Sequence, residues 1–312
     1  MNMHRAILIV NPSSGRELAA ENADRIATLL RSRYEDLEVV TTAGDGDAER
    51  AAASAVTAGR GTVFVAGGDG TVNEAVNGVA GADGLSQVRF GIIPMGTGND
   101  FAAGLGIPPD LDEALRVLND QRELRVDLGS VNGRVFINTS GGGYIAEVSV
   151  AVTPQLKTIA GRLAYLIGGA QALLEYEPVS ATISAEPGGL RLGLKLYAFA
   201  VCNSRLIGGG RLIAPSALVD DGLLDVCLIE GMSAMEFMNL GRKVADGGHV
   251  DDPRVRYLQV SSLLIELEPE AWINTDGEVL SAKRCEYTIR PAAATFLVGD
   301  APFSVANEAR QP

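Results

Sequence analysis

The segment Ala66–Glu74 contains the residues of this chain whose types and spacing best suit phosphate chemistry. Three of its glycines surround Asp69, and Thr71 follows directly after them. Glycines lack the Cβ atoms that would keep the main chain away from phosphate oxygens, and they permit a positive φ in a tight turn. Asp69 suits a metal ion or a hydroxyl group, because a carboxylate would repel a bare phosphate. Many turns carry two glycines for steric reasons alone, so the complete Gly-Gly-Asp-Gly-Thr string is what favours a ligand-binding turn.

An apolar, strand-like run precedes this turn, and a helical pattern follows it. Thr62–Val65 is short and apolar, while Val72, Val76 and Val79 recur on one face of the helix expected next. The first turn of a helix has unpaired N–H groups and a positive dipole end, and both favour an anion. The segment therefore predicts a phosphate-binding site at the junction of a strand and a helix.

The scarcity of histidine limits the other chemistry open to this chain. Only His4 and His249 occur, which excludes an H-E-x-x-H motif, a His-rich zinc site and a Ser-His-Asp triad. Any proton that is moved is therefore expected to be moved by a carboxylate. The three cysteines, Cys202, Cys227 and Cys285, form no C-x-x-C motif. They are predicted to be buried free thiols in a reducing compartment.

Strands and helices alternate in the N-terminal part of the chain, which predicts an α/β domain with a doubly wound parallel sheet. The expected strands are 6–10, 37–41, 62–66 and 90–93, and the expected helices are 17–33, 47–56 and 111–118. Ligands bind beyond the carboxyl ends of such strands. Four loops rich in small polar residues are expected at that edge, namely Asn11–Arg16, Thr42–Gly46, Gly67–Thr71 and Pro94–Asp100.

Strand-like runs punctuated by glycine and proline dominate from about Leu124 onward, which predicts a β-sandwich second domain. The expected strands are 124–131, 135–139, 179–184, 192–201, 223–229, 256–260, 263–267, 271–274 and 286–290. Helical patterns interrupt them at 154–175 and 233–244. The first domain is therefore expected to span 1–123 and the second 124–291, and the tail after Ser304 is expected to be frayed.

Composition and charge exclude several classes of function. The 312 residues are 46% hydrophobic and 21% charged, which is typical of soluble globular proteins. With 26 basic and 39 acidic residues the net charge is −13, which argues against nucleic-acid binding. The apolar run Ala6–Val10 is too short for a signal peptide, and no run reaches the roughly 18 residues of a membrane span. A cytoplasmic protein with no transmembrane segment, and with peripheral membrane contact at most, is expected.

Three common nucleotide-binding patterns are absent: the P-loop, the G-x-G-x-x-G after the first strand, and the protein-kinase motifs. The motifs that are present resemble those of the diacylglycerol kinase catalytic-domain family, especially its bacterial soluble lipid kinases. The two main motifs are the glycine turn with Asn73-Glu74, and Pro94-x-Gly96-Thr97-x-Asn99-Asp100-Phe101-Ala102. Supporting matches occur in family order over nearly the whole chain, namely Asn11-Pro12-x-Ser14-Gly15, Gly208-Gly209-Gly210, Asp221-Gly222-Leu223-Leu224-Asp225 and Asp276-Gly277-Glu278.

The resemblance implies a Mg²⁺-dependent lipid kinase of phospholipid biosynthesis that transfers the γ-phosphate of ATP to a hydroxyl of a diacylglycerol-like lipid. ATP would bind in a cleft between the two domains. The last strand, 294–298, would return to the first domain as part of a segment 292–312. The candidate nucleotide-binding residues are Asn11, Arg16, Thr42, Gly67, Gly68, Asp69, Gly70, Thr71, Val72, Asn73, Glu74, Thr97, Asn99 and Asp100. Of these, Arg16 is either a phosphate partner or a solvated surface arginine.

The resemblance assigns the role of general base to Asp276. A carboxylate within reach of an attacking alcohol can take its proton, so this role is physically reasonable. Taken alone, Asp-Gly between two strands also predicts an ordinary hairpin turn. Glu278 points the same way on the strand two residues later, and it is expected either to tune Asp276 or to share its metal.

The resemblance also implies a structural Mg²⁺. This ion would be bound by the Asp221 side chain and by the carbonyl groups of Leu218 and Leu223, because Mg²⁺ prefers oxygen ligands. Asp220 and Asp225 are further candidates for the same role. Asp221-Gly222 is by itself also a turn signal.

The lipid acceptor stays open at this point. The pattern at 154–175 places apolar side chains at helical spacing beside Lys157 and Arg162, which suits a lid over a lipid tail, a membrane contact or ordinary packing. Glu147 follows Tyr144-Ile145-Ala146, a departure from the family pattern on the acceptor side. Diacylglycerol, another glycerolipid or a sphingoid base at the membrane surface would fit. Two alternatives are a soluble kinase related to NAD kinase and a catalytically silent nucleotide-binding protein. The oligomeric state, a homodimer included, is open.

Overall fold

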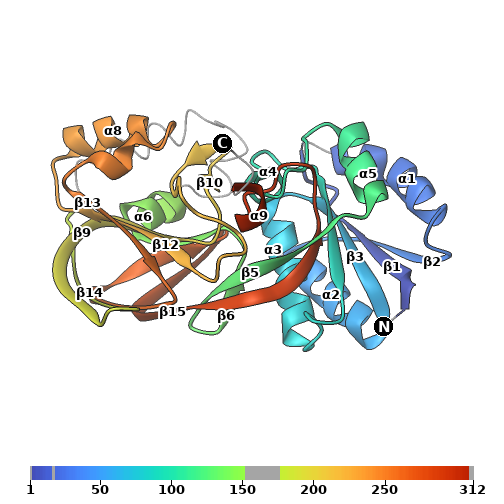
Figure 1. Ribbon diagram of the computed structural model, residues 1–312, viewed down its shortest axis with the longest axis horizontal. Coiled ribbons are helices and arrows are strands. Elements are labelled where there is room, and N and C mark those ends of the chain that lie inside the picture. Colours follow the sequence, from blue (N-terminus) through green and yellow to red (C-terminus); the bar gives the residue numbers. More distant parts are fainter. Residues whose placement is uncertain (1, 16–17, 152–175, 309–312) are drawn as a thin grey trace.

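The computed structural model describes residues 2–15, 18–151 and 176–308. The chain forms two lobes (Figure 1). One lobe contains β1–β4 with helices α1, α2, α3 and α5, and the other is built mainly from strands β7–β9 and β12–β15. Ten strands follow one hydrogen-bonded path that runs through both lobes, in the order β13-β12-β9-β7-β14-β15-β4-β3-β1-β2. The predicted fold class, α/β followed by a β-sandwich-like domain, is confirmed.

The α/β lobe has the predicted parallel sheet. Its elements are β1 (Asn2–Val10), α1 (Leu18–Arg31), β2 (Asp36–Thr41), α2 (Asp47–Thr57), β3 (Arg60–Gly67), α3 (Asp69–Gly81), β4 (Arg89–Pro94), α4 (Asp100–Gly104) and α5 (Leu111–Asp120). The strands β2, β1, β3 and β4 pair in parallel in that order. Alternate residues of β1 enter different cores: Ile7 and Ile9 pack with α2 and α3, while Leu8 packs with α1 and α5. Such strands are buried on both faces and are therefore apolar throughout.

The second lobe contains the remaining elements. They are β5 (Glu123–Val131), β6 (Arg134–Phe136), β7 (Thr139–Gly143), α6 (Tyr144–Ala151), β8 (Val179–Glu186), β9 (Leu190–Cys202), β10 (Leu206–Ile207), β11 (Arg211–Leu212), β12 (Leu224–Glu230), α8 (Ala234–Lys243), a 3₁₀ turn (Gly248–Asp251), β13 (Val255–Val260), β14 (Ser262–Thr275), β15 (Glu278–Leu297) and α9 (Val305–Glu308). Strands β7 and β8 each pair with both β9 and β14. This arrangement encloses an apolar core that includes Phe199, Ile265 and Ile273.

The strand β15 joins the two lobes. Its first half pairs with β14, and its last residues pair in parallel with β4, Thr295 with Arg89 and Phe296 with Phe90. The Phe296 ring stacks on Phe90 at 5.0 Å and meets Phe101 edge-on at 5.2 Å. The expected strand 294–298 is therefore the end of β15 and pairs with the parallel sheet. The division of the chain into 1–123, 124–291 and 292–312 stays a proposal.

Several predicted elements were wrong in their boundaries. The strand expected at 135–139 is two strands, β6 and β7, because the N–H groups of Ile137, Asn138 and Thr139 bind a carboxylate instead of a neighbouring strand. The strands expected at 263–267 and 271–274 are one strand, β14, with a register shift between them. The strand expected at 286–290 likewise belongs to the long β15.

The chain after Ser304 was expected to be frayed, which is wrong for Val305–Glu308. These residues form α9, and Glu308 forms an ion pair with Arg205 at 2.7 Å. The predicted helix at 154–175 lies outside the described residues. The helix predicted at 233–244 is present as α8 and begins with a capping box between Ser233 and Glu236. In the part of the chain that the structure describes, no helix is both long and apolar enough to cross a membrane.

Gly78 on α3 lets this helix pack closely against α2. A Cβ built there would lie 2.0 Å from the carbonyl oxygen of Glu49, an overlap with backbone that no rotamer change relieves. Replacing Gly78 by alanine is therefore expected to lower the free energy of unfolding by about 1–3 kcal/mol, measured by urea denaturation. Gly81 on the same helix is the matched control, because a Cβ there meets nothing within 4 Å. Equal unfolding midpoints for the two alanine variants would contradict this packing.

Candidate active site

The loops after β1, β2 and β3 are tied together at the carboxyl edge of the parallel sheet. Asn11 Nδ2, just after β1, donates a hydrogen bond to Thr71 Oγ1 over 2.9 Å. The N–H of Gly46, in the loop after β2, donates to Glu74 Oε2 over 3.1 Å. Burial raises the pKa of the Glu74 carboxyl above its usual value. These loops therefore meet around the start of α3, as the sequence predicted.

The glycines of the turn allow close approach and do not adopt unusual dihedral angles. Gly68 has a φ of −94°, and neither Gly67 nor Gly70 has a positive φ, so that expectation was wrong. A Cβ at Gly68 would lie 3.2 Å from the Cα of Gly96, and a Cβ at Gly67 would lie 2.8 Å from the Thr71 side chain. At Gly70 a Cβ would meet nothing within 4 Å. The turn is thus pressed against the loop after β4, with open space beside Gly70.

Asp69 anchors that neighbouring loop. Its carboxylate accepts hydrogen bonds from the backbone N–H groups of Asp100 at 3.1 Å and Phe101 at 3.0 Å. These are two of the unpaired N–H groups at the start of α4. Burial raises the pKa of Asp69, against the lowering effect of both hydrogen bonds. Sequence reasoning expected Asp69 to face a metal or a hydroxyl and did not predict this anchoring role.

Asp100 extends the same network to a second glycine-rich segment. Its carboxylate accepts from the N–H groups of Gly209 at 2.9 Å and Gly210 at 2.7 Å. All three residues belong to motifs that the sequence singled out, but their contact could not be read from the sequence. Asp100 is buried, and its carboxylate binds these two glycines within the protein.

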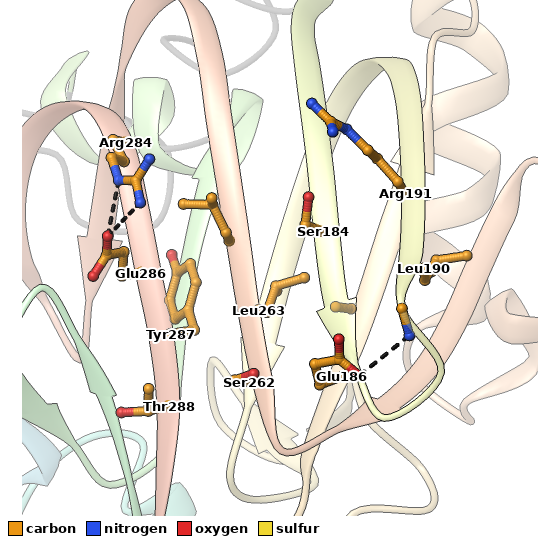
Figure 2. Close-up of a pocket in the computed structure, with 13 residues that line it drawn as sticks. Ser184, Glu186, Leu190, Arg191, Ser262, Leu263, Arg284, Glu286, Tyr287 and Thr288 are labelled. Atoms are coloured by element: carbon orange, nitrogen blue, oxygen red, sulfur yellow. Dashed lines mark hydrogen bonds and ion pairs between the residues drawn. The ribbon is translucent and has the colours of Figure 1, made fainter.

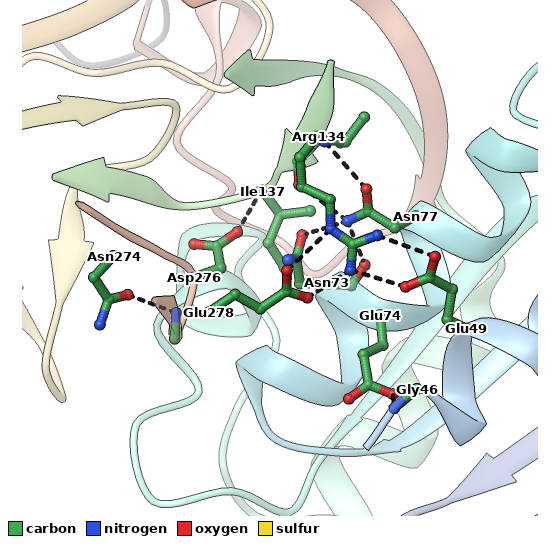
Figure 3. Close-up of polar contacts among 12 residues, drawn as sticks. Gly46, Glu49, Asn73, Glu74, Asn77, Arg134, Ile137, Asn274, Asp276 and Glu278 are labelled. Atoms are coloured by element: carbon green, nitrogen blue, oxygen red, sulfur yellow. Dashed lines mark hydrogen bonds and ion pairs between the residues drawn. The ribbon is translucent and has the colours of Figure 1, made fainter. Parts of the chain in front are cut away.

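Asp276 lies at the hairpin between β14 and β15, with a φ of 47° and Gly277 at 98°. The hairpin interpretation of Asp-Gly is therefore correct, because two positive φ values are the signature of a type I′ turn. The carboxylate also accepts three backbone hydrogen bonds, from Ile137 at 2.6 Å, Asn138 at 3.2 Å and Thr139 at 2.9 Å. Figure 3 shows the first of them. We call the N–H groups of residues 137–139 the amide cradle.

Burial raises the pKa of the Asp276 carboxyl to about 7, and the Asp69 charge contributes to the shift. The three cradle N–H groups act in the opposite direction, since they stabilise the carboxylate. Asn138 connects the two acids: its N–H binds Asp276, and its Nδ2 lies 3.4 Å from Asp69 Oδ1. The acid that the resemblance assigned as base therefore lies close to the glycine turn.

Asn138 also presents an unused acceptor at this point. Its Oδ1 atom is buried without a hydrogen-bond partner among the described residues. A buried polar atom costs free energy unless it is paired, so this oxygen fits a bound hydroxyl donor or a cation. The donor set beside Asp69 and Asp276 thus suits a Mg²⁺ ion or an alcohol.

Glu278 is held by an arginine that the sequence analysis missed. Arg134, on β6, contacts Glu278 through Nε at 3.1 Å and Nη2 at 2.5 Å (Figure 3). The same guanidinium contacts Glu49 on α2 through Nη1 at 3.0 Å and Nη2 at 2.8 Å. These partners belong to different lobes, and no motif in the sequence pointed to their meeting.

The other candidate nucleotide-binding residues differ in their surroundings. Thr97 is exposed in the loop after β4, whereas Thr42 is buried and its N–H donates to the carbonyl of Val10. Asn99 has a φ of 55° and closes its own loop by two hydrogen bonds with Gly96. Thr97 therefore presents its side chain to solvent, whereas Thr42 and Asn99 stabilise the loops that contain them.

Val72 and Asn73 point into the protein. Val72 lies in the core of the α/β lobe, and Asn73 is 1% exposed with its side-chain oxygen accepting from Asn77 Nδ2 at 3.2 Å. Neither side chain is exposed to solvent. Arg16 lies outside the described residues.

The segment around Asp221 is a turn surrounded by acids. Asp221 Oδ1 accepts from the N–H of Leu223 at 2.9 Å, and burial together with Asp127 and Asp220 raises the pKa of Asp221. Asp225 is buried, and its Oδ2 has no partner among the described residues. Repelling carboxylates of this kind fit a cation. Within the described residues, however, no three carboxylate, imidazole or thiol groups come close enough together to hold a metal.

A surface pocket of about 380 Å³ is lined by residues of β8, β9, β14 and β15 (Figure 2). Ser262, which lines it, begins β14, whereas Asp276 follows the other end of that strand. In this pocket Arg284 contacts Glu286 at 2.6 Å. The pocket is therefore separate from the site around Asp69 and Asp276.

Comparisons with known proteins show which family the chain is similar to. Residues 5–131 match the family described as "Diacylglycerol kinase catalytic domain", and residues 139–298 match "YegS C-terminal NAD kinase beta sandwich-like domain". A diacylglycerol kinase of Bacillus subtilis (strain 168) is 34% identical over 279 residues, covering 88% of this chain and 90% of that protein. One from Staphylococcus aureus (strain JH9) is 34% identical over 275 residues, with coverages of 88% and 86%.

A solved structure from Bacillus anthracis str. Sterne, described provisionally as a diacylglycerol kinase, superposes with a TM-score of 0.81. It is 26% identical in sequence and covers 97% of each chain. The similarity thus extends over both lobes, including the glycine turn and the hairpin that bears Asp276. This chain belongs to the diacylglycerol kinase catalytic-domain family.

Proposed function

We propose that this protein transfers the γ-phosphate of ATP to the hydroxyl group of diacylglycerol, with Asp276 as the general base. The observation that carries the proposal is the position of Asp276. Its carboxylate lies in the amide cradle, and Asn138 connects it to Asp69 of the glycine turn. A phosphate donor at the turn and an alcohol at Asp276 would therefore be neighbours.

The reaction follows from these positions. The O–H bond of the lipid alcohol breaks as its proton moves to the Asp276 carboxylate, and the oxygen forms a bond to the γ-phosphorus as ADP leaves. A pKa of about 7 suits a base that must accept a proton and release it again near neutral pH. Asn138 Oδ1, buried and unpaired among the described residues, would orient the hydroxyl or accept from it.

The loops around α3 would hold ATP. Their glycines let the main chain approach the phosphates, and the first turn of α3 offers a positive dipole end. Mg²⁺, when bound, neutralises charge on the phosphates during transfer. Asp69 and Asn138 have the oxygen atoms that this ion prefers. A second, structural Mg²⁺ at Asp221 with the carbonyls of Leu218 and Leu223 remains part of this proposal.

The acceptor lies in a bilayer, so the protein would work at a membrane surface from the cytoplasmic side. Net charge of −13 argues for contact through a limited area, because an acidic protein is repelled by anionic lipids. The nucleotide would be bound by the α/β domain, and the β-rich domain would supply the base and the acceptor site.

A transfer assay over several acceptors tests the function. Radiolabelled ATP is offered with diacylglycerol, monoacylglycerol or a sphingoid base in mixed micelles, or with soluble NAD. Label in the diacylglycerol product, and little elsewhere, is expected. Labelling of NAD alone would instead establish a soluble kinase. ATP binding without transfer to any acceptor would establish a silent nucleotide-binding protein, and either result would reject the proposal.

A further inference from the structure

Helix α3 connects the glycine turn to the second lobe. Its first residue is Asp69, and Asn77 lies two turns later on the same helix. Asn77 is buried, and its side chain pairs with both backbone groups of Val135 on β6: Nδ2 donates to the carbonyl oxygen at 3.0 Å, and Oδ1 accepts from the N–H at 3.1 Å. An amide that satisfies both groups of one residue holds that strand at a defined position.

The next residue of α3, Gly78, sets the position of α2. Its missing Cβ leaves room for the Glu49 carbonyl oxygen, which would lie 2.0 Å from such an atom. The helix that carries the phosphate-binding turn therefore positions Glu49 as well as Val135. The Glu49 side chain contacts Arg134, and Val135 follows Arg134 in the sequence.

Arg134 connects these elements to the catalytic hairpin. Two of its nitrogens bind the two carboxylate oxygens of Glu49, and a bidentate pair of this kind fixes the guanidinium plane. Its Nε and Nη2 then bind both oxygens of Glu278. Glu278 follows the Asp276-Gly277 turn directly, so its position constrains one side of that turn.

The other side of Asp276 depends on the same arginine. Arg134 and Val135 belong to β6, which leads directly into the amide cradle of residues 137–139. Asp276 thus lies between the amide cradle and Glu278. The cradle follows β6, the strand that contains Arg134, and Glu278 binds the Arg134 side chain. Glu49 in turn attaches them to the nucleotide lobe (Figure 3).

We propose that Arg134 is a positioning residue, which sets the distance between the phosphate-binding turn and Asp276 by binding Glu49 and Glu278 together. This inference rests on the proposed kinase function. It assigns Glu49 and Asn77 a part in turnover, although neither is expected to touch a substrate.

If the role of Arg134 were purely structural, its loss would lower turnover only as far as it lowers the stability of the protein. Its side chain is 29% exposed, and those of Glu49 and Glu278 are 36% and 43% exposed. Ion pairs this exposed contribute little to stability, because solvent screens the two charges. Loss of Arg134 should therefore change the melting temperature little. A misplacement of reacting groups by about 1 Å can lower turnover about 100-fold.

The test compares Arg134→Met and Arg134→Lys with Arg60→Met in the full chain. Arg60 is the matched control, because it also binds two carboxylates, Asp36 and Glu38, at 2.9 and 3.0 Å. It lies at the opposite end of β3 from the glycine turn, and its side chain is only 10% exposed. Transfer of phosphate to diacylglycerol is measured with ATP and lipid varied separately, beside the melting temperature.

Arg134→Met should lower kcat about 100-fold with a nearly unchanged KM for ATP. Arg134→Lys should recover little of the loss, because an ammonium cannot bind two carboxylates bidentately. Arg60→Met should destabilise the protein more and leave kcat unchanged. In addition, Glu49→Gln should lower kcat in the wild-type chain and have no further effect in Arg134→Met.

Three results would overturn the inference. They are a normal kcat for Arg134→Met, losses of kcat that follow the melting temperature across the arginine variants, and a Glu49→Gln effect that persists without Arg134. If the wild-type protein itself transfers no phosphate to diacylglycerol, the proposed function fails and this inference fails with it. A failure confined to the variants leaves the kinase function intact.

Discussion

Replacing Asp276 by asparagine is expected to lower phosphoryl transfer to diacylglycerol by about 10²–10⁴-fold, the usual contribution of a positioned general base. The amide cannot take the proton of the lipid hydroxyl. Its single oxygen, in place of Oδ1, can still accept from the N–H groups of Asn138 and Thr139, while the Ile137 N–H loses its acceptor Oδ2, so two of the three cradle contacts should remain. ATP binding, measured by isothermal titration calorimetry, should remain because the loops around α3 are unchanged.

Asp110→Asn is the matched control for this substitution. Asp110 also accepts a backbone hydrogen bond, from the N–H of Glu113 at 3.1 Å, but it does so as the N-cap of α5, away from the site. Asparagine serves equally well as an N-cap, so this variant should have normal turnover. If Asp276→Asn kept the wild-type rate, a different group would be the base.

Replacing Gly96 by alanine is expected to abolish most transfer and to destabilise the protein. A Cβ at Gly96 would lie 2.5 Å from the Cα of Gly68 and 2.8 Å from Asn99 Oδ1. Since the first contact is with backbone, the loop after β4 must move away from the glycine turn. Overpacking of this kind costs about 1–3 kcal/mol of folding free energy. Urea denaturation and the KM for ATP measure the two effects.

Gly70→Ala distinguishes an effect on ATP binding from an effect on stability. A Cβ at Gly70 meets nothing within 4 Å, and the residue is in the first turn of α3, where alanine is favoured over glycine. Its stability should therefore equal or exceed that of the wild type. Its KM for ATP should rise, because the methyl group would occupy space that the phosphates need. Wild-type stability and turnover in Gly96→Ala would show that the two loops do not depend on each other.

The α/β lobe was largely predictable because its signals are local. Buried parallel strands are apolar throughout, and the glycine string marks the turn between β3 and α3. The reason for the glycines was not predictable, because Gly68 faces Gly96 from a loop that is distant in sequence. The role of Asp276 as base was proposed from the family resemblance, since the Asp-Gly pair alone predicts only a hairpin.

The contacts between the two lobes could not be predicted from the sequence. Arg134 and Asn77 belong to no motif, and their roles arise only when β6 is placed beside α2 and α3. The break between β6 and β7 was missed because the apolar pattern continues through Ile137, while the N–H groups there turn to Asp276. Two strands were expected at 263–267 and 271–274, yet β14 continues through a register shift between Glu266 and Ala271.

The most direct test of the account is the pH dependence of kcat/KM for diacylglycerol at saturating ATP. A general base is active as the carboxylate, so protonation below its pKa removes activity. With the pKa of Asp276 raised by burial to about 7, the logarithm of kcat/KM should rise by one per pH unit below that value and level off above it. A profile that is flat between about pH 5 and 8, within the range in which a base of this kind titrates, would contradict the assignment of Asp276 as the base.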